Sequence, residues 1–194
     1  SSKALGIVLT LRANGSASSV ELAGFPHHAL DTYLPKLVRA GYKVAVCDQL
    51  EDPKLAKKIV KRGITEVVTP GLSYNPQLLE ASEHNFLASL FTDRTQEGEL
   101  TGIAFTDIST GTIQIAQGDR VYVESLLSQY NPREILVPRD EEKKWKISAG
   151  SASFVSTLDK WAFVYDAAQE KVKTQFGVDS LKGFGIENLP LAIS

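Results

Sequence analysis

Two adjacent histidines, His27 and His28, are the first residues in this chain that suggest chemistry, because imidazole nitrogens bind zinc. Adjacent side chains diverge on a helix or a strand, and a zinc site needs further ligands at helical or loop spacing. The third histidine, His84, is far along the chain, and Cys47 is the only cysteine. The spacing therefore argues against a metal site, and we expect one histidine to bond at a turn and the other to face solvent.

The sequence contains no motif for a catalytic nucleophile or for binding a nucleotide. Cys47 ends the apolar stretch KVAVC, which predicts a short buried strand with an inert thiol. The sequence holds no G-x-S-x-G, no G-x-x-x-x-G-K-[ST] and no G-x-G-x-x-G. We expect no nucleophile, nucleotide or other cofactor in this chain.

Carboxylates make the best case for an enzyme. Asp107 and Glu124 lie where a nuclease with a ribonuclease-H-like fold could carry acids for two metal ions. Later strands offer only Glu134 and Asp159, at strand ends, where single acids cap turns. The sequence favours a chain without catalytic activity, and an Mg²⁺-dependent nuclease is the alternative.

Basic residues are the remaining candidates, as contacts to phosphate. Arg12 ends a predicted strand beside the Asn14-Gly15 turn, and further lysines and arginines recur along two predicted helices. The alternative for the lysines is a solvated face. The candidate DNA-backbone-binding residues are Arg12, Asn14, Lys36, Arg39, Lys57, Lys61 and Arg62.

Composition bounds the class of protein. The chain has 194 residues, 43% hydrophobic, with a net charge of -2, which predicts a globular protein of one large or two small domains. No overall basicity marks a nucleic-acid binder, so that role would need a local patch. One cysteine is typical of a reducing cytoplasm, and no apolar run approaches the roughly 20 residues of a membrane helix.

The first segment alternates strand and helix. Residues 3–12 predict one strand, and 19–24 return after the tight turn as a second. An apolar stripe predicts a helix that starts near Asp31, so that Pro35 falls in its first turn, and ends at Gly41. A second, lysine-rich helix is predicted from Pro53 to Gly63.

The second segment changes rhythm after a polar stretch, residues 73–84, that predicts a linker. The strands and helices expected beyond it are residues 85–93, 100–109 and 111–118 as a β-meander, a helix from Asp119, strands at 133–138 and 151–158, and a helix ending at Gly177. Three strands, a helix and a strand resemble the order of the ribonuclease-H-like fold.

Ordered motifs across the whole chain resemble the MutS family of DNA mismatch-recognition proteins. The matching stretches are AGFPHHA (23–29), KLV (36–38), KVAVCDQ (43–49), DP (52–53), VTPG (68–71), DISTG (107–111), NPREIL (131–136) and LKGFGIEN (181–188). The resemblance implies an α/β chain whose residues 1–72 are the later part of the mismatch-binding domain. It further implies that residues 85–194 are most of a ribonuclease-H-like connector without nuclease activity.

The resemblance also implies the partners of the intact protein and which of its activities this chain would lack. The intact protein would bind mismatched double-stranded DNA as a dimer, hydrolyse ATP with Mg²⁺ and recruit MutL through the connector, in the cytoplasm at the nucleoid. The family's Phe-x-Glu wedge and its ATPase domain are absent from this sequence. We therefore expect DNA-backbone contact, with Arg12 at the family's position for it, but no mismatch preference. A pure protein-interaction module is the second alternative.

Overall fold

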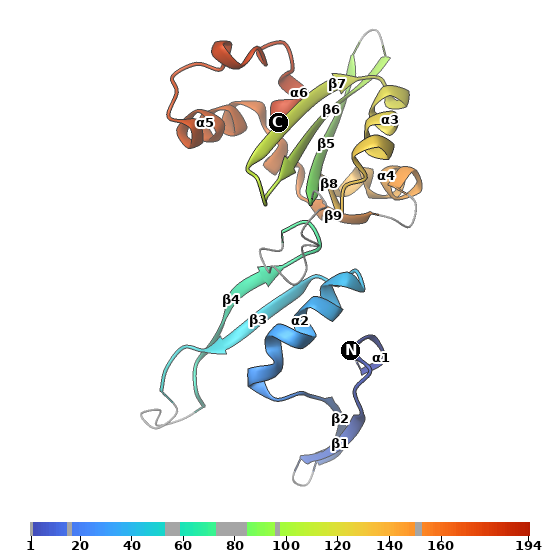
Figure 1. Cartoon of the computed structure of the whole chain (residues 1–194), viewed down its shortest axis with the longest axis vertical. Helices are drawn as coiled ribbons and strands as arrows, with labels where there is room; N and C mark the ends of the chain where they lie inside the picture. The colour runs from blue at the N-terminus through green and yellow to red at the C-terminus, as the bar shows by residue number, and fades with distance from the viewer. Residues whose placement is uncertain (1, 15–16, 53–58, 73–84, 96–97, 150–152) are drawn as a thin grey trace. The chain divides into compact units, whose positions relative to one another are not determined.

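The structure, a computed structural model, divides the chain into two compact units, Ser1–Ala81 and Ser82–Ser194, which we describe one at a time (Figure 1). The residues it describes are 2–14, 17–52, 59–72, 85–95, 98–149 and 153–194. The expected linker at 73–84 and most of the expected lysine-rich helix, including Lys57, lie outside them. No helix of the described part is long and apolar enough to cross a membrane.

The first unit begins with a helix and an antiparallel ribbon. The elements are α1 (Ser2–Leu5), β1 (Leu9–Asn14) and β2 (Ala17–Ala23). The prediction of one strand over 3–12 was wrong in its first half, because Ser2–Leu5 is helical. Gly6 ends this turn at φ +65°, a left-handed conformation that favours glycine, and the strand starts only at Leu9.

The next helix starts slightly earlier than expected and contains its proline in the interior. A 3₁₀ turn η1 (His27–Ala29) leads into α2 (Leu30–Arg39), so Pro35 lies in the interior and not in the first turn. Proline leaves the Asp31 carbonyl without its helical donor, and this residue is exposed, so water can take that place. The predicted end at Gly41 is confirmed, with φ +79° and bonds from Gly41 N to Val38 O and from Tyr42 N to Leu37 O.

The second ribbon pairs β3 (Val44–Gln49) with β4 (Arg62–Val68) in antiparallel register. The expected helix end at Gly63 was wrong, because Gly63 pairs with Asp48 inside β4, a strand rich in β-branched residues.

Burial in this ribbon also corrects the prediction for Cys47. The strand is present, but Cys47 is exposed. Within the described part of the first unit, the core around this ribbon comprises Leu34, Val38 and Val68, with Leu30 and Val44 packed against it. When a ribbon packs on one face, every second residue along each strand lies on the other face and is left in solvent.

The second unit is a five-stranded mixed sheet in the order β7-β6-β5-β8-β9. The strands are β5 (Phe86–Thr95), β6 (Gly98–Asp107), β7 (Thr112–Gly118), β8 (Glu134–Pro138) and β9 (Phe154–Leu158). The meander β5-β6-β7 is antiparallel, and β8 joins β5 and β9 in parallel. The predicted strands are thus confirmed.

Helices lie on both faces of this sheet, α3 and α4 on one and α6 on the other, with α5 packed against α6 (Figure 1). They are α3 (Arg120–Tyr130), α4 (Glu142–Ala149), α5 (Tyr165–Phe176) and α6 (Pro190–Ile193), with 3₁₀ turns η2 (Arg139–Glu141), η3 (Lys160–Phe163) and η4 (Lys182–Phe184). The predicted start of α3 at Asp119 is confirmed, and the structure adds that the Asp119 side chain caps the helix by accepting from Tyr122 N at 2.8 Å. The α3–α4 face holds the main core, including Ile103, Phe105 and Trp145.

Candidate nucleic-acid interface

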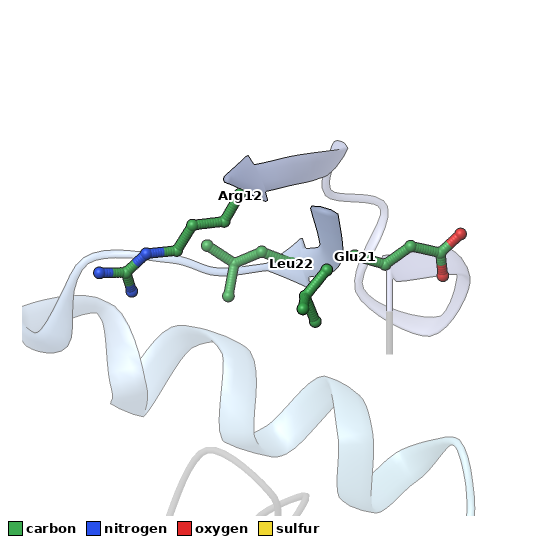
Figure 2. Close-up of a pocket in the computed structure, with 4 residues that line it drawn as sticks. Arg12, Glu21 and Leu22 are labelled. Carbon is green, nitrogen blue, oxygen red and sulfur yellow. The ribbon is translucent and has the colours of Figure 1, made fainter. Parts of the chain in front are cut away.

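Arg12 lies on the β1–β2 ribbon, directly opposite Val20. Paired residues of antiparallel strands share a face, so Arg12 projects beside Val20, and Leu22, two pairs further along, lies on the same face. These side chains and Glu21 line an open hollow of about 340 Å³. Figure 2 shows the guanidinium at one end of it and the Glu21 carboxylate pointing away from it. Arg12 is exposed and makes no hydrogen bond or ion pair with any residue that the structure describes, so its charge is available to an anion.

The end of this ribbon is irregular where Asn14 stands. The register shifts between Arg12 and Asn14, and Asn14 pairs with Ala17 in the last rung before residues 15–16, which lie outside the described part. A shift of this kind twists the strand and re-aims nearby side chains. The two strands that flank the predicted turn are thus paired.

Lys36 and Arg39 lie on the exposed side of the last two turns of α2. The Lys36 Nζ stands 4.9 Å from the centroid of the Tyr33 ring. Tyr33 is not among the predicted site residues, although its three-residue spacing from Lys36 on a helix was a visible signal. Arg39 has a partner within the chain.

Lys61 and Arg62 are not on a helix. Arg62 begins β4 opposite Gln49, and Lys61 precedes it, with its backbone N–H donating to Glu51 Oε1 at 2.6 Å. Arg39 is the last residue of α2, which leads into the start of β3, whereas Arg62 pairs with Gln49, the last residue of β3. The two arginines therefore lie toward opposite ends of the ribbon.

The described candidate cations therefore occupy three places, namely the β1–β2 ribbon, α2 and the far end of the β3–β4 ribbon. The structure does not bring them into one cluster. Each could contact a separate phosphate of an extended polyanion, which suits a duplex backbone better than a small anion.

The histidines and acids give no metal site in the described part of the chain. His27 and His28 are both exposed on η1, and no group of three or more His, Cys, Asp or Glu side chains stands ready for a metal ion there.

The acids named for a nuclease point apart. Asp107 pairs with Phe86 and Glu134 pairs with Leu87, so their side chains lie on opposite faces of the sheet. Asp107 is buried and accepts from Ser109 N and Oγ at 3.0 and 2.6 Å, the turn-capping role expected of a lone acid. The nuclease alternative finds no converging carboxylates in the described residues.

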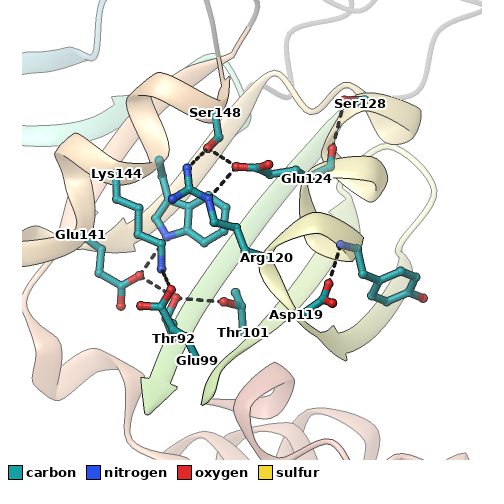
Figure 3. Close-up of polar contacts among 12 residues, drawn as sticks. Thr92, Glu99, Thr101, Asp119, Arg120, Glu124, Ser128, Glu141, Lys144 and Ser148 are labelled. Carbon is teal, nitrogen blue, oxygen red and sulfur yellow. Dashed lines mark hydrogen bonds and ion pairs between the residues drawn. The ribbon is translucent and has the colours of Figure 1, made fainter. Parts of the chain in front are cut away.

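Glu124 belongs to a polar network that ties α3 to α4 (Figure 3). Its Oε1 accepts from Ser148 Oγ at 2.6 Å and from Arg120 Nε at 2.8 Å. These two donors hold the pKa of the Glu124 carboxyl below its ordinary value of 4.5, with Ser148 the larger cause. The carboxylate is therefore engaged in joining two helices.

The lowered pKa makes this link sensitive to acid. A carboxyl with a depressed folded-state pKa adds stability above its unfolded value of 4.5 and loses it as pH falls through the folded value. We expect Glu124→Gln to lower the unfolding free energy more at about pH 7 than at about pH 3, because the contribution of the carboxylate is lost progressively as pH falls below 4.5. Urea denaturation at both pH values measures this. Glu170→Gln, on the exposed face of α5, is the control, and an equal deficit for Glu124→Gln at both pH values would contradict the expectation.

Comparison with known proteins decides the family. Residues 1–76 match the family described as MutS domain I, and residues 85–194 match MutS domain II. The chain belongs to the MutS family. It is 52% identical to the DNA mismatch repair protein MutS of Parabacteroides distasonis, over 97% of this chain and 21% of that protein. The MutS of Porphyromonas gingivalis is 52% identical over 100% of this chain and 21% of its own length, and that of Cytophaga hutchinsonii 49% over 97% and 22%.

The chain thus spans about a fifth of the MutS proteins it matches, and the resemblance seen in its motifs is confirmed. A solved structure of the HTLV-2 integrase catalytic core domain in complex with magnesium overlaps 54% of this chain and 83% of its own at 9% identity, with a TM-score of 0.24. That overlap is too low to bear on the fold. In MutS terms, Arg12 and the other candidate cations belong to domain I, and the five-stranded sheet belongs to domain II.

Proposed function

We propose that this chain supplies the DNA-backbone-contacting part of domain I and the connector of a MutS-type mismatch repair protein. The proposed contact with DNA rests on the exposure and position of Arg12. This residue is exposed, it is free of partners in the described residues, and it lies at the end of a ribbon where it can approach a phosphate. Lys36, Arg39, Lys61 and Arg62 add cations on other elements.

Binding by this chain should be electrostatic and should not distinguish a mispaired base. Kinking at a mismatch needs an inserted apolar wedge that offsets an unstacking cost of a few kcal/mol. The described apolar surface beside Arg12 consists of strand side chains, Val20 and Leu22, with no aromatic ring among them. Fluorescence anisotropy with matched and single-mismatch duplexes of about 20 base pairs tests this. Equal affinities that fall with salt are expected. A clear preference for the mismatch would contradict the missing-wedge argument, and binding indifferent to salt would contradict backbone contact.

Arg12→Ala is expected to weaken binding to both duplexes equally. Removing one phosphate contact should lower the salt slope by about 0.9 and the affinity about three- to tenfold at low salt. Lys171→Ala, an exposed cation on α5, is the matched control and should leave both quantities unchanged. Equal effects of the two substitutions would show that Arg12 acts only through net charge.

The rest of the proposal concerns the whole protein. We place ATP and Mg²⁺ binding, hydrolysis and dimerisation in parts of MutS outside this chain, and MutL recruitment on domain II, in the cytoplasm at the nucleoid. The finer fold of domain II is proposed to be ribonuclease-H-like, on the support of its antiparallel meander continued by two parallel strands with helices on both faces.

A further inference from the structure

A column of two rings and a cation stands on α2. The Phe25 and Tyr33 rings are stacked with centroids 4.5 Å apart and planes at 25°, and the Lys36 ammonium lies 4.9 Å from the Tyr33 centroid. Tyr33 and Lys36 are one helical turn apart, and Phe25 comes from the segment that enters η1. Both rings are half-buried and Lys36 is exposed. We call this the Phe25–Tyr33–Lys36 column.

We infer that Tyr33 is a positioning residue for DNA-backbone binding and acts through Lys36. The inference rests on the proposed function, in which domain I contacts phosphates. It goes beyond that function by assigning a role to an aromatic residue that need not touch DNA.

The physical reason is preorganisation. A lysine side chain on a flexible four-carbon stem loses rotamer freedom when it binds a phosphate. The face of an aromatic ring attracts an ammonium, so Tyr33 restricts Lys36 before any ligand arrives. Part of the ordering cost of binding is then already met in the free protein.

Phe25 extends the same argument by one layer. Its ring stacks on Tyr33 and limits the orientations that the Tyr33 ring can take. An ammonium held over a ring directs only part of its surface to that ring, so N–H donors remain for a phosphate oxygen. The column therefore holds the Lys36 ammonium in one orientation on the exposed face of α2.

A double-mutant cycle on the 194-residue chain tests this, with anisotropy of a matched duplex of about 20 base pairs over a salt series. We expect Lys36→Ala to reduce the salt slope by about 0.9, because one phosphate contact is lost. Tyr33→Leu should weaken binding about two- to fivefold with the slope retained, and Tyr33→Phe should bind like the parent chain. With Lys36→Ala already present, Tyr33→Leu should have no further effect.

The outcomes separate the inference from the proposed function. Additive effects of the two substitutions, or no effect of Lys36→Ala while Arg12→Ala still weakens binding, would overturn the role of Tyr33 and leave backbone contact standing. No effect of either cation would overturn backbone contact itself. Circular dichroism checks that each variant is folded, and Phe25→Leu, expected to weaken binding in the same direction, replaces Tyr33→Leu should the latter not fold.

Discussion

Trp145→Ala is expected to lower the unfolding free energy of the second unit by about 3–5 kcal/mol, the cost of emptying a large core site. Trp145 is completely buried on α4 and packs in the main core of the sheet. Its Nε1 donates to Glu141 Oε2 at 2.9 Å, and the same oxygen accepts from Thr92 Oγ1 at 2.7 Å. The substitution therefore removes both a ring and a link between α4 and β5.

Urea denaturation followed by far-UV circular dichroism measures this loss. Trp145→Phe keeps a six-membered ring in the core but loses the N–H donor and the rest of the indole, so it should cost less than Trp145→Ala and more than about 1–2 kcal/mol for the hydrogen bond alone. Trp161→Ala is the matched control. Trp161 is 75% exposed, so its removal should change stability by less than about 0.5 kcal/mol. Similar losses for Trp145→Ala and Trp161→Ala would contradict the packing described for α4.

Gly102→Ala is expected to displace α6 from the sheet and to cost about 2–3 kcal/mol. A Cβ at Gly102 would lie 2.1 Å from the Leu191 carbonyl carbon and 2.2 Å from Ala192 N. Both are backbone atoms, so no rotamer change relieves the overlap. Moving α6 away would also expose Ala192 and Ile193 and break the bond from Leu191 N to Gln117 Oε1, 3.0 Å long.

Hydrogen exchange gives the most direct measurement, since the Leu191 amide should lose protection in Gly102→Ala. Gly183→Ala is the control, because a Cβ there meets nothing within 4 Å. That replacement should leave stability unchanged or raise it slightly by reducing unfolded-state entropy. Unchanged protection of Leu191 in Gly102→Ala would mean that α6 does not rest on this glycine.

Local signals predicted the second unit well. The alternating apolar residues of the meander, the helix start at Asp119 and Gly177 with φ +63° after α5 all act within a few residues of the chain, and each is found where expected. The helix α4 was not predicted, because half of its stretch EKKWKISA is charged and Trp145 is its only buried residue. The segment is helical because it packs against β8 and β9, a contact that the local sequence does not indicate.

The first unit was predicted less well, for a related reason. Its ribbons bury few side chains in the described residues, so propensity and burial give weak constraints. Gly63 was assigned to a helix end because glycine commonly stands there, whereas its pairing with Asp48 places it in a strand. Pro35 was assigned to the first turn because an interior proline removes one helical hydrogen bond. The carbonyl that loses its donor belongs to Asp31, which is exposed, so an interior position is tolerated.

By itself, the sequence determined the family, through ordered motifs along the whole chain, and most strands and helices of the second unit, through periodicity and caps. Tertiary structure alone decided which residues act together. It directed Asp107 and Glu134 to opposite faces, engaged Glu124 with Ser148, spread the cations over three elements and set Lys36 over Tyr33. Periodicity is a property of neighbouring residues, whereas such contacts depend on how strands pair and helices pack across the chain.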